Sequence, residues 1–301
     1  MLRTGKSMTN IFRPQRLSDI VGQKLVKECI SILLKSRRGK SLPHILFESC
    51  GPGLGKTTFA YALANETGSD ILLANGGNIS KPKHVLPLLA RLKRGDILFI
   101  DEIHRISSNV QESLFTVMED FRYDIAKGAN SIHLEEFTLI GATTEAGMLL
   151  RPFYDRFEHH FHLDYYNIED LTEIVLNSSR KLGCFVDKET AEKIAQLSRF
   201  TPRIANSFLS WCNDFAKSNG NNLINSNIFD QARRLKQIES NGIDLVDKKY
   251  LDSLERFGRP AGITTICAAT GLSRSTIESQ IEPFLIKLGL VMKTTKGRVK
   301  V

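Results

Sequence analysis

The sequence has few cysteines and no long apolar segment, and both absences narrow the class of protein. Its five cysteines (Cys29, Cys50, Cys184, Cys212, Cys267) lie far apart with no CxxC spacing, which argues against a disulfide framework and against a zinc module. No apolar run approaches the roughly 20 residues that a membrane-spanning helix needs. The first ten residues also lack the apolar stretch of a signal peptide. We therefore expect a protein of the reducing cytoplasm with no membrane partner.

Internal repeats and low-complexity segments are also missing. At 301 residues the chain is long enough for two or three globular domains. The formal net charge of +8 is unevenly distributed. Residues 1–40 carry ten Lys and Arg against two acids, and residues 250–301 carry eight against four. Basic ends around a slightly acidic middle favour a polyanionic partner, although a merely solvated basic surface has the same composition.

The first half of the chain alternates strand and helix patterns. Short apolar runs at 44–49, 96–102 and 137–144 indicate strands, and helical spacing occurs at 18–38 and 57–68. This alternation predicts an α/β fold, with a parallel sheet covered by helices on both faces.

Beyond about residue 165 the strand patterns stop. Apolar residues recur at helical spacing in three segments, 168–183, 189–198 and 202–218, which predicts a compact helical domain. From 245 onward the pattern indicates short helices and then a hairpin with Gly297 at its tip.

A glycine-rich segment, CGPGLGKTT (50–58), lies between a predicted strand and a predicted helix. Backbone N–H groups at such a place hold the phosphates of a nucleotide. We expect amides of Gly53, Gly55 and Thr58 to contact phosphate, Lys56 to neutralise the β- and γ-phosphates, and Thr57 to ligate Mg²⁺.

The phosphate loop departs from the strict motif at one position. Cys50 occupies the place of the first glycine, and Gly51 follows one residue later. This departure predicts a shifted or strained entry to the loop. It also motivates an alternative in which the protein binds ATP but hardly hydrolyses it.

Two carboxylates end the apolar run at 96–102. We expect Asp101 to hold Mg²⁺ through water, and Glu102 to orient and deprotonate the water that attacks the γ-phosphate. An Asp-Glu pair at a strand end is common by chance, so this prediction depends on the phosphate loop upstream. The next strand ends in Thr143 and Thr144, either of which can reach a water near the γ-phosphate or simply finish the strand.

Two arginines are candidates for nucleotide sensing. Arg156 in DRF (155–157) has the character of a finger that an oligomer inserts into a neighbour's site, and Arg203 begins a helix from which it can reach the bound nucleotide. Ordinary surface charge is the alternative for both.

Eight blocks in the same order resemble the RuvB family, AAA+ motors that drive branch migration of Holliday junctions in bacterial recombination, DNA repair and the SOS response. These blocks are FRPQRLSDIVGQ (12–23), GLGKTT, LFIDEIHR (98–105), MEDF (118–121), FTLIGATT, DRF, TPRIAN (201–206) and LGLVMKTTKGRV (288–299). The resemblance implies an AAA+ P-loop core with a helical lid and a winged-helix head. The expected domains are the ATPase domain (1–165), the lid (166–238) and the head (239–301).

The resemblance also implies roles for further residues. Phe12, Arg13 and Tyr166 are implied to contact adenine and ribose, and Glu119, Asp120 and Phe121 to complete the pocket for ATP and Mg²⁺. Arg156 takes the finger role and Arg203 that of the second sensor. On the wing, Lys293 and Arg298 match the family's two DNA-backbone positions, with lysine at 293 where arginine is usual, so the bidentate fork is lost there.

The implied partners are duplex and Holliday-junction DNA, a RuvA-type junction-binding protein, a RuvC-type resolvase, and copies of the chain in a hexameric ring. The segment between MEDF and FTLIG, which in the family forms the hairpin that contacts RuvA, is several residues shorter here, with KGANS at its expected tip. Five basic residues and no acids occur in 284–301, so salt-dependent, sequence-independent contact with DNA is expected. A clamp-loader-like or replication-associated AAA+ ATPase is the alternative, although it should lack the terminal wing.

Overall fold

The computed structural model describes residues 11–37, 41–126 and 130–301, apart from the side chains of 124–126 and 130. The chain forms two compact units, Met1–Tyr166 and Asn167–Val301. Within the described residues, no helix is both long and apolar enough to cross a membrane.

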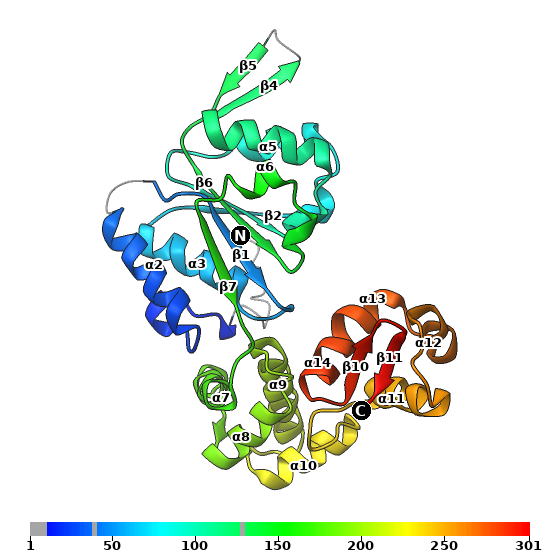
Figure 1. Cartoon of the computed structure of the whole chain (residues 1–301). Helices are drawn as coiled ribbons and strands as arrows, with labels where there is room; N and C mark the ends of the chain where they lie inside the picture. The colour runs from blue at the N-terminus through cyan, green and yellow to red at the C-terminus, as the bar shows by residue number, and fades with distance from the viewer. Residues whose placement is uncertain (1–10, 38–40, 127–129) are drawn as a thin grey trace. The chain divides into compact units, whose positions relative to one another are not determined.

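A five-stranded parallel sheet forms the centre of the first unit (Figure 1), and its strand order is β2-β3-β6-β1-β7. The strands are β1 (Ile45–Ser49), β2 (Ile71–Asn75), β3 (Ile97–Asp101), β6 (Thr138–Thr143) and β7 (His159–Leu163). The strands predicted at 44–49, 96–102 and 137–144 are thus confirmed, and β2 and β7 are the two outer strands that the apolar pattern did not identify. Because β6 lies between β1 and β3, the carboxyl ends of these three strands meet at one edge of the sheet.

Helices cover both faces of this sheet, as predicted. Helices α2 (Lys24–Ser36) and α3 (Lys56–Thr67) lie on one side, and α5 (Ser108–Asp120) and α6 (Arg151–Tyr154) on the other (Figure 1). The short helix α4 (Leu86–Leu89) contributes Leu89 to the buried cluster that contains the apolar residues of α5. Strand β3 shows the physical reason. Leu98 and Ile100 join one buried cluster with Val110, Leu114 and Val117 of α5, which leaves the alternate side chains for the α3 side. A strand that is apolar on both faces requires this double cover.

The helix predicted over 18–38 begins later than its Ser18/Asp19 cap indicated. Residues Leu17–Asp19 form a 3₁₀ turn instead, and α2 starts at Lys24. Gly22 and Gln23 both have positive φ, 73° and 49°, a conformation that a right-handed helix cannot include. The predicted end of the helix at 57–68 is confirmed, since Gly68 adopts the left-handed C-cap conformation.

The second unit contains the three helices predicted individually, over 168–183, 189–198 and 202–218, and five that the sequence pattern did not locate one by one. Its first part holds α7 (Ile168–Leu182), α8 (Lys188–Gln196), α9 (Pro202–Ser218) and α10 (Ser226–Leu235), with a two-residue pairing of β8 (Phe185–Val186) and β9 (Leu223–Ile224). Its second part holds α11 (Leu245–Phe257), α12 (Ile263–Thr270), α13 (Arg274–Thr276), a π-helical turn (Ile277–Ile281) and α14 (Glu282–Lys287). The division of the chain into three domains at 165 and 238 stays a prediction.

The chain closes with the predicted hairpin, formed by β10 (Val291–Thr294) and β11 (Gly297–Lys300). Gly297 begins the second strand, so Thr295 and Lys296 form the tip where Gly297 was expected. At φ 133° Gly297 lies against residue 261, and a Cβ there would come within 2.4 Å of the Ala261 carbonyl oxygen. Glycine is therefore required by this close backbone approach, which the Ala261–Arg298 bridge fixes.

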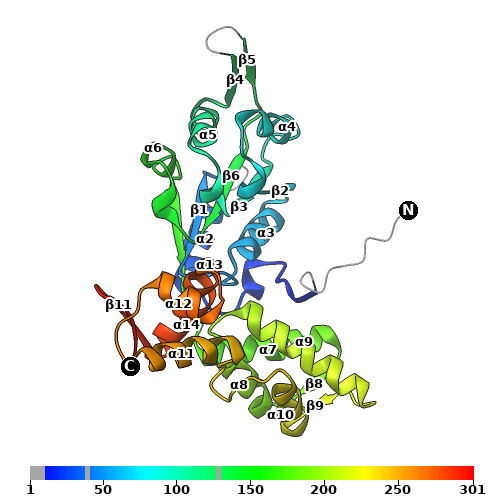
Figure 2. The ribbon, with the colours of Figure 1, turned by 90° about the vertical axis from the view of Figure 1, so that its right-hand side faces the viewer.

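A second hairpin projects from the first unit beyond the end of α5, as both views show (Figures 1 and 2). Its strands are β4 (Arg122–Ala126) and β5 (Asn130–His133). The hairpin expected between MEDF and FTLIG is therefore present, but most of its expected KGANS tip lies outside the described residues.

Candidate nucleotide site and DNA-binding surface

The phosphate loop connects β1 to α3 in a conformation that only glycine adopts without strain. Gly53 and Gly55 have φ of 83° and 110°, and Gly55 is the N-cap of α3. The loop therefore turns directly into a helix N-terminus, where unsatisfied N–H groups and the helix dipole favour an anion. These residues fit a nucleotide phosphate chain.

Lys56 and Ser49 meet inside this loop. The Lys56 side chain is buried, and its amine donates a hydrogen bond to Ser49 Oγ, which in turn donates to the Gly51 carbonyl at 2.7 Å. Ser49 is the last residue of β1. The hydroxyl thus positions the lysine ammonium against the loop, where it adds positive charge to the anion site.

Cys50 is exposed and lies beside the segment that follows β7. Its sulfur is 3.9 Å from both the Leu163 carbonyl and Asp164 Oδ1. Gly51, the next residue, lies under Tyr165, because a Cβ on it would be 3.2 Å from the Tyr165 hydroxyl. Burial and the neighbouring Cys50 raise the pKa of Tyr165. The loop entry is therefore packed against residues 163–165, and the glycine needed for close approach is Gly51.

Asp101 and Glu102 lie at the carboxyl end of β3, one strand removed from the phosphate loop. Asp101 Oδ1 accepts the Glu102 backbone N–H at 3.0 Å. Glu102 has a left-handed φ of 48°, and its carboxylate pairs with Arg105 at 2.9 Å. Both side chains of that pair are about half exposed, so the pairing is weak. Glu102 is thus available at the edge of the site.

Thr143 ends β6, between the phosphate loop and Asp101, and Thr144 follows it. The Thr143 hydroxyl is buried, accepts the Glu145 N–H at 2.9 Å and shares a 2.9 Å hydrogen bond with His104 Nδ1. Thr144 is exposed. Of the two hydroxyls, that of Thr143 is therefore engaged in the protein, and that of Thr144 is exposed to solvent.

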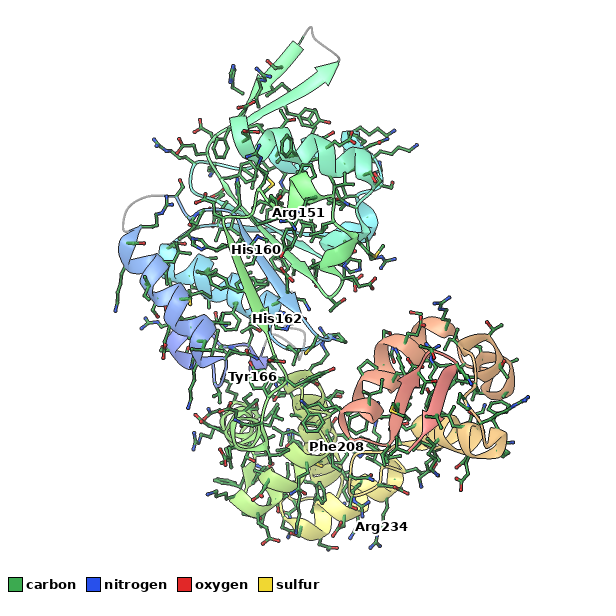
Figure 3. The ribbon with its side chains drawn as sticks, viewed as in Figure 1. Arg151, His160, His162, Tyr166, Phe208 and Arg234 are labelled. Carbon is green, nitrogen blue, oxygen red and sulfur yellow. The ribbon has the colours of Figure 1, made fainter. Side chains whose placement is uncertain are left out.

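The residues expected to contact adenine and ribose lie near the first turns of α3. The Arg13 guanidinium is 4.3 Å from the centre of the Tyr61 ring. The buried Tyr166 follows β7 (Figure 3), and its hydroxyl is 3.8 Å from where a Cβ on Gly55 would be. Phe12 precedes Arg13 and is partly buried. The structure thus brings Tyr166 next to the phosphate loop and Arg13 onto the helix that follows it.

Arg156 lies at the opposite edge of the sheet. It precedes β7, whose first residue, His159, is in register with Ile45 at the start of β1. Its guanidinium pairs with Glu119 at 2.9 Å and stacks on Phe115 at 4.6 Å. The length of a five-residue strand, roughly 17 Å, separates this edge from the phosphate loop. Arg156 therefore cannot reach the phosphates of its own chain.

Lys293 and Arg298 are neighbours across the terminal hairpin. Arg298 donates to Glu282 Oε1 at 2.8 Å and to Glu278 Oε1 at 3.0 Å, and Lys293 pairs with Glu282 Oε2 at 2.6 Å. The Glu282 side chain is 0% exposed, that of Arg298 15% and that of Lys293 49%. Arg298 thus connects the wing to α14, whereas Lys293 is half exposed.

Known proteins match the chain over nearly its whole length. Family models match residues 12–163 (Holliday junction DNA helicase RuvB P-loop domain), 166–239 (RuvB AAA lid domain) and 240–300 (RuvB C-terminal winged helix domain). The chain belongs to the RuvB family. The expected fold class, a P-loop core with a helical lid and a winged helix, is thereby confirmed.

Individual RuvB proteins are also similar. The Holliday junction branch migration complex subunit RuvB of Rhodopirellula baltica is 43% identical over 297 residues, covering 95% of this chain and 81% of its own. Subunit RuvB 1 of Synechococcus sp. is 41% identical, with 98% and 80% covered. The structure of the Thermotoga maritima RuvB Holliday junction branch migration motor superposes with a TM-score of 0.88 at 33% identity, covering 97% of this chain and 96% of that one.

The RuvB resemblance placed Glu119, Asp120 and Phe121 in the nucleotide pocket, and the structure places them elsewhere in this chain. They end α5 beside Arg156, and Phe121 packs against His44, the residue before β1. They therefore lie about a strand length from the chain's own phosphate loop. Within one chain these three residues are therefore separate from the phosphate loop.

Arg203 is exposed at the second position of α9, after the N-cap Thr201.

Sequence reasoning did not identify Ser49, His104 and Arg105 as contributors to the site. Arg105 had a local signal, because it lies three residues after Glu102 next to the strand end. Ser49 and His104 had none, since their partners are set by the alignment of separate strands.

Proposed function

We propose that this chain is the ATP-driven motor subunit that moves the branch point of Holliday junctions along duplex DNA. Membership in the RuvB family makes it a P-loop ATPase of branch migration. The observation that carries the proposal is the order of chemistry along one sheet edge: phosphate loop, Thr143 and Asp101–Glu102 end three adjacent strands, and a winged-helix family model matches the end of the same chain.

In the nucleotide site, the amides of Gly53, Gly55 and Thr58 receive phosphate oxygens. Lys56, held by Ser49, neutralises the transferring phosphate. Thr57 and Asp101 are the residues suited to hold Mg²⁺, because a hydroxyl and a carboxylate oxygen are the ligands that this ion prefers. Bound Mg²⁺ supplies positive charge to the phosphates.

Hydrolysis requires Glu102 to face water near the γ-phosphate. Its pairing with Arg105 is half exposed and competes with solvent at little cost. Released from Arg105, the carboxylate accepts a proton from the attacking water. The exposed Thr144 hydroxyl and the buried Thr143 hydroxyl are on the strand between this base and Lys56, where they can orient that water.

Arg156 serves a neighbouring subunit. Its place at the amino edge of the sheet, a strand length from the chain's own phosphates, supports action in trans, with Glu119, Asp120 and Phe121 on the same surface. An arginine finger stabilises charge that develops on the transferring phosphoryl group. A closed ring, expected to be hexameric, gives every site such a neighbour. Arg203 senses the nucleotide from the lid.

The wing is proposed to contact the DNA backbone. Lys293 is half exposed, and Lys296 at the tip is exposed, so these cations can reach phosphate. Arg298 orients the wing through Glu278 and Glu282. Contacts of this kind hold duplex without reading its sequence and weaken with salt.

The relatives are described as subunits of a branch migration complex, which supports a RuvA-type junction-binding partner, and a RuvC-type resolvase is expected to act on the same junction. The β4–β5 hairpin, which carries the exposed Ile132, is the proposed contact with the RuvA-type protein.

The experiment is a branch-migration assay on a synthetic four-way junction, with ATP turnover measured in the same reaction. We expect ATP-dependent migration that requires a RuvA-type protein for full rate, and none with Lys56→Ala. Turnover without migration would support the clamp-loader-like alternative instead. No turnover, with Glu102→Gln unchanged from wild type, would support a scaffold that binds ATP without hydrolysing it.

A further inference from the structure

An unusual turn precedes α9, the helix that carries Arg203. Ser198 and Thr201 close the turn through a 3.0 Å hydrogen bond from the Thr201 N–H to the Ser198 carbonyl. Its two central residues, Arg199 and Phe200, both have positive φ, 51° and 60°. Positions of this kind are usually occupied by glycine or asparagine. Two bulky side chains persist in such a conformation only where their surroundings require it.

The Arg199 side chain binds the N-terminus of α11. Its guanidinium donates to Asp244 at 2.7 Å and to Asp247, whose side chain is fully buried. These two aspartates form the capping box of α11, each accepting the other's backbone N–H at 3.0 Å. Arg199 therefore neutralises both carboxylates that begin α11 and fixes that helix end to the turn.

Phe200 enters the core of the terminal part of the chain. It packs against the buried cluster that contains Tyr250, Ile281 and Leu285. Its ring centroid is 6.3 Å from that of Phe284 on α14, and the Arg199 guanidinium is 4.8 Å from the centre of the same Phe284 ring. One ring of α14 therefore contacts both central residues of the turn.

The neighbouring backbone approaches closely at the same place. Gly242 has φ of 84°, and a Cβ on it would be 3.4 Å from both the Leu197 Cα and the Phe284 ring. Residues 197–200, 242–247 and 284 thus form one tightly packed junction. Three residues after Phe200, α9 presents the exposed Arg203.

We infer that Arg199 and Phe200 are positioning residues that couple the nucleotide state read by Arg203 to the winged-helix head. This inference deepens the proposed function and rests on it. The turn is the N-terminal connection of α9, so a displacement of Arg203 toward or away from nucleotide displaces the turn. Through Arg199 and Phe200, the turn contacts the start of α11 and Phe284 of α14, the two helices that support the wing. Loss of the two side chains should uncouple hydrolysis from DNA movement without blocking hydrolysis.

The test measures the number of base pairs migrated per ATP hydrolysed by the full-length chain, on a synthetic four-way junction with a RuvA-type protein. For Arg199→Ala and Phe200→Ala we expect ATP turnover without DNA within about twofold of wild type, and at least a fivefold lower ratio of migration to hydrolysis. Arg199→Lys keeps the positive charge but loses the forked geometry of the guanidinium, so its ratio of migration to hydrolysis should lie between those of wild type and Arg199→Ala. Asp244→Asn, which leaves the Arg199–Asp247 contact, is a milder variant in case Arg199→Ala does not fold.

Lys248→Ala is the matched control. Lys248 pairs with Glu239 at 2.7 Å, also near the start of α11, but both side chains are more than 40% exposed. Its ratio should equal that of wild type. A purely structural role for the turn would lower ATP turnover and migration in parallel, so that the ratio of migration to hydrolysis stays at the wild-type value. That result would overturn the inference, and so would Arg199→Ala and Phe200→Ala variants that keep full turnover, full migration and the wild-type ratio. If wild type itself hydrolyses ATP but moves no junction, the proposed function fails instead.

Discussion

Arg298 offers a sharp test, because the structure gives it a role different from phosphate contact alone. Arg298→Ala removes the guanidinium that bridges Glu278 and Glu282, and Glu282 is a carboxylate with no exposed side-chain surface. Removing one member of a buried ion pair costs about 3–5 kcal/mol. Lys293 stays on the other oxygen of Glu282, so we expect the lower end of that range, about 3 kcal/mol. Lys293→Ala removes a half-exposed partner and should cost about 1 kcal/mol or less.

Urea unfolding can measure both changes. The only tryptophan of the chain is Trp211 in α9, so its fluorescence follows the second unit, and amide hydrogen exchange over β10 and β11 follows the wing. The double variant Arg298→Met, Glu282→Gln should recover most of the loss, since it removes the uncompensated charge and leaves a side chain that can still accept from Tyr250. A loss below 1 kcal/mol in Arg298→Ala would refute the anchoring role. It would instead favour a phosphate contact, whose loss reduces the magnitude of the slope of log K against log salt by about 1.

Three further outcomes are expected. Arg156→Ala should keep nucleotide binding and lower ATP turnover by about 10³-fold, and mixing it with Glu102→Gln subunits should restore part of the turnover, because a finger acting in trans reaches the intact neighbour. A mixture as inactive as its components would contradict this. Burial lowers the pKa of His44 below its ordinary 6.5, so the contribution of neutral His44 to the stability of the first unit should be fully present above pH 6.5 and be lost as pH falls. The loss of stability with falling pH should be less steep in His44→Gln. Burial raises the pKa of Asp247 from 3.8 to about 6, so the stability that its protonated form contributes is present below pH 4 and is lost as pH rises through 6. Asp247→Asn should remove that slope in unfolding followed by Trp211, and an equal slope in both proteins would count against it.

Local signals account for what the sequence predicted well. The phosphate loop, the strand before it and the helix after it are encoded within 25 residues by an apolar run, glycines and a C-cap at Gly68, so they could be read in order. The lid helix ending at Ser218 was equally clear, because its apolar spacing runs unbroken from Pro202.

Features that depend on separate segments could not be read in this way. The distance of Arg156 from its own phosphates follows from the register of β7 on β1. The burial of Arg298 follows from Glu282 and Glu278, which precede it by 16 and 20 residues on another element. The turn at Arg199 and Phe200 had no signal at all, since neither residue type favours positive φ. Strand β2 was missed because its side chains are only partly buried and its apolar run is short.

The central claim is that hydrolysis at the phosphate loop drives movement of a DNA junction. The most direct measurement compares wild type with Glu102→Gln in one reaction that records ATP hydrolysis and migration of a labelled four-way junction, with a RuvA-type protein present. We predict that wild type does both, and that Glu102→Gln binds ATP as tightly as wild type but loses both activities together, by about 10²-fold or more. Migration that continues at the wild-type rate in Glu102→Gln, or junctions that never move while wild type hydrolyses ATP, would contradict the claim.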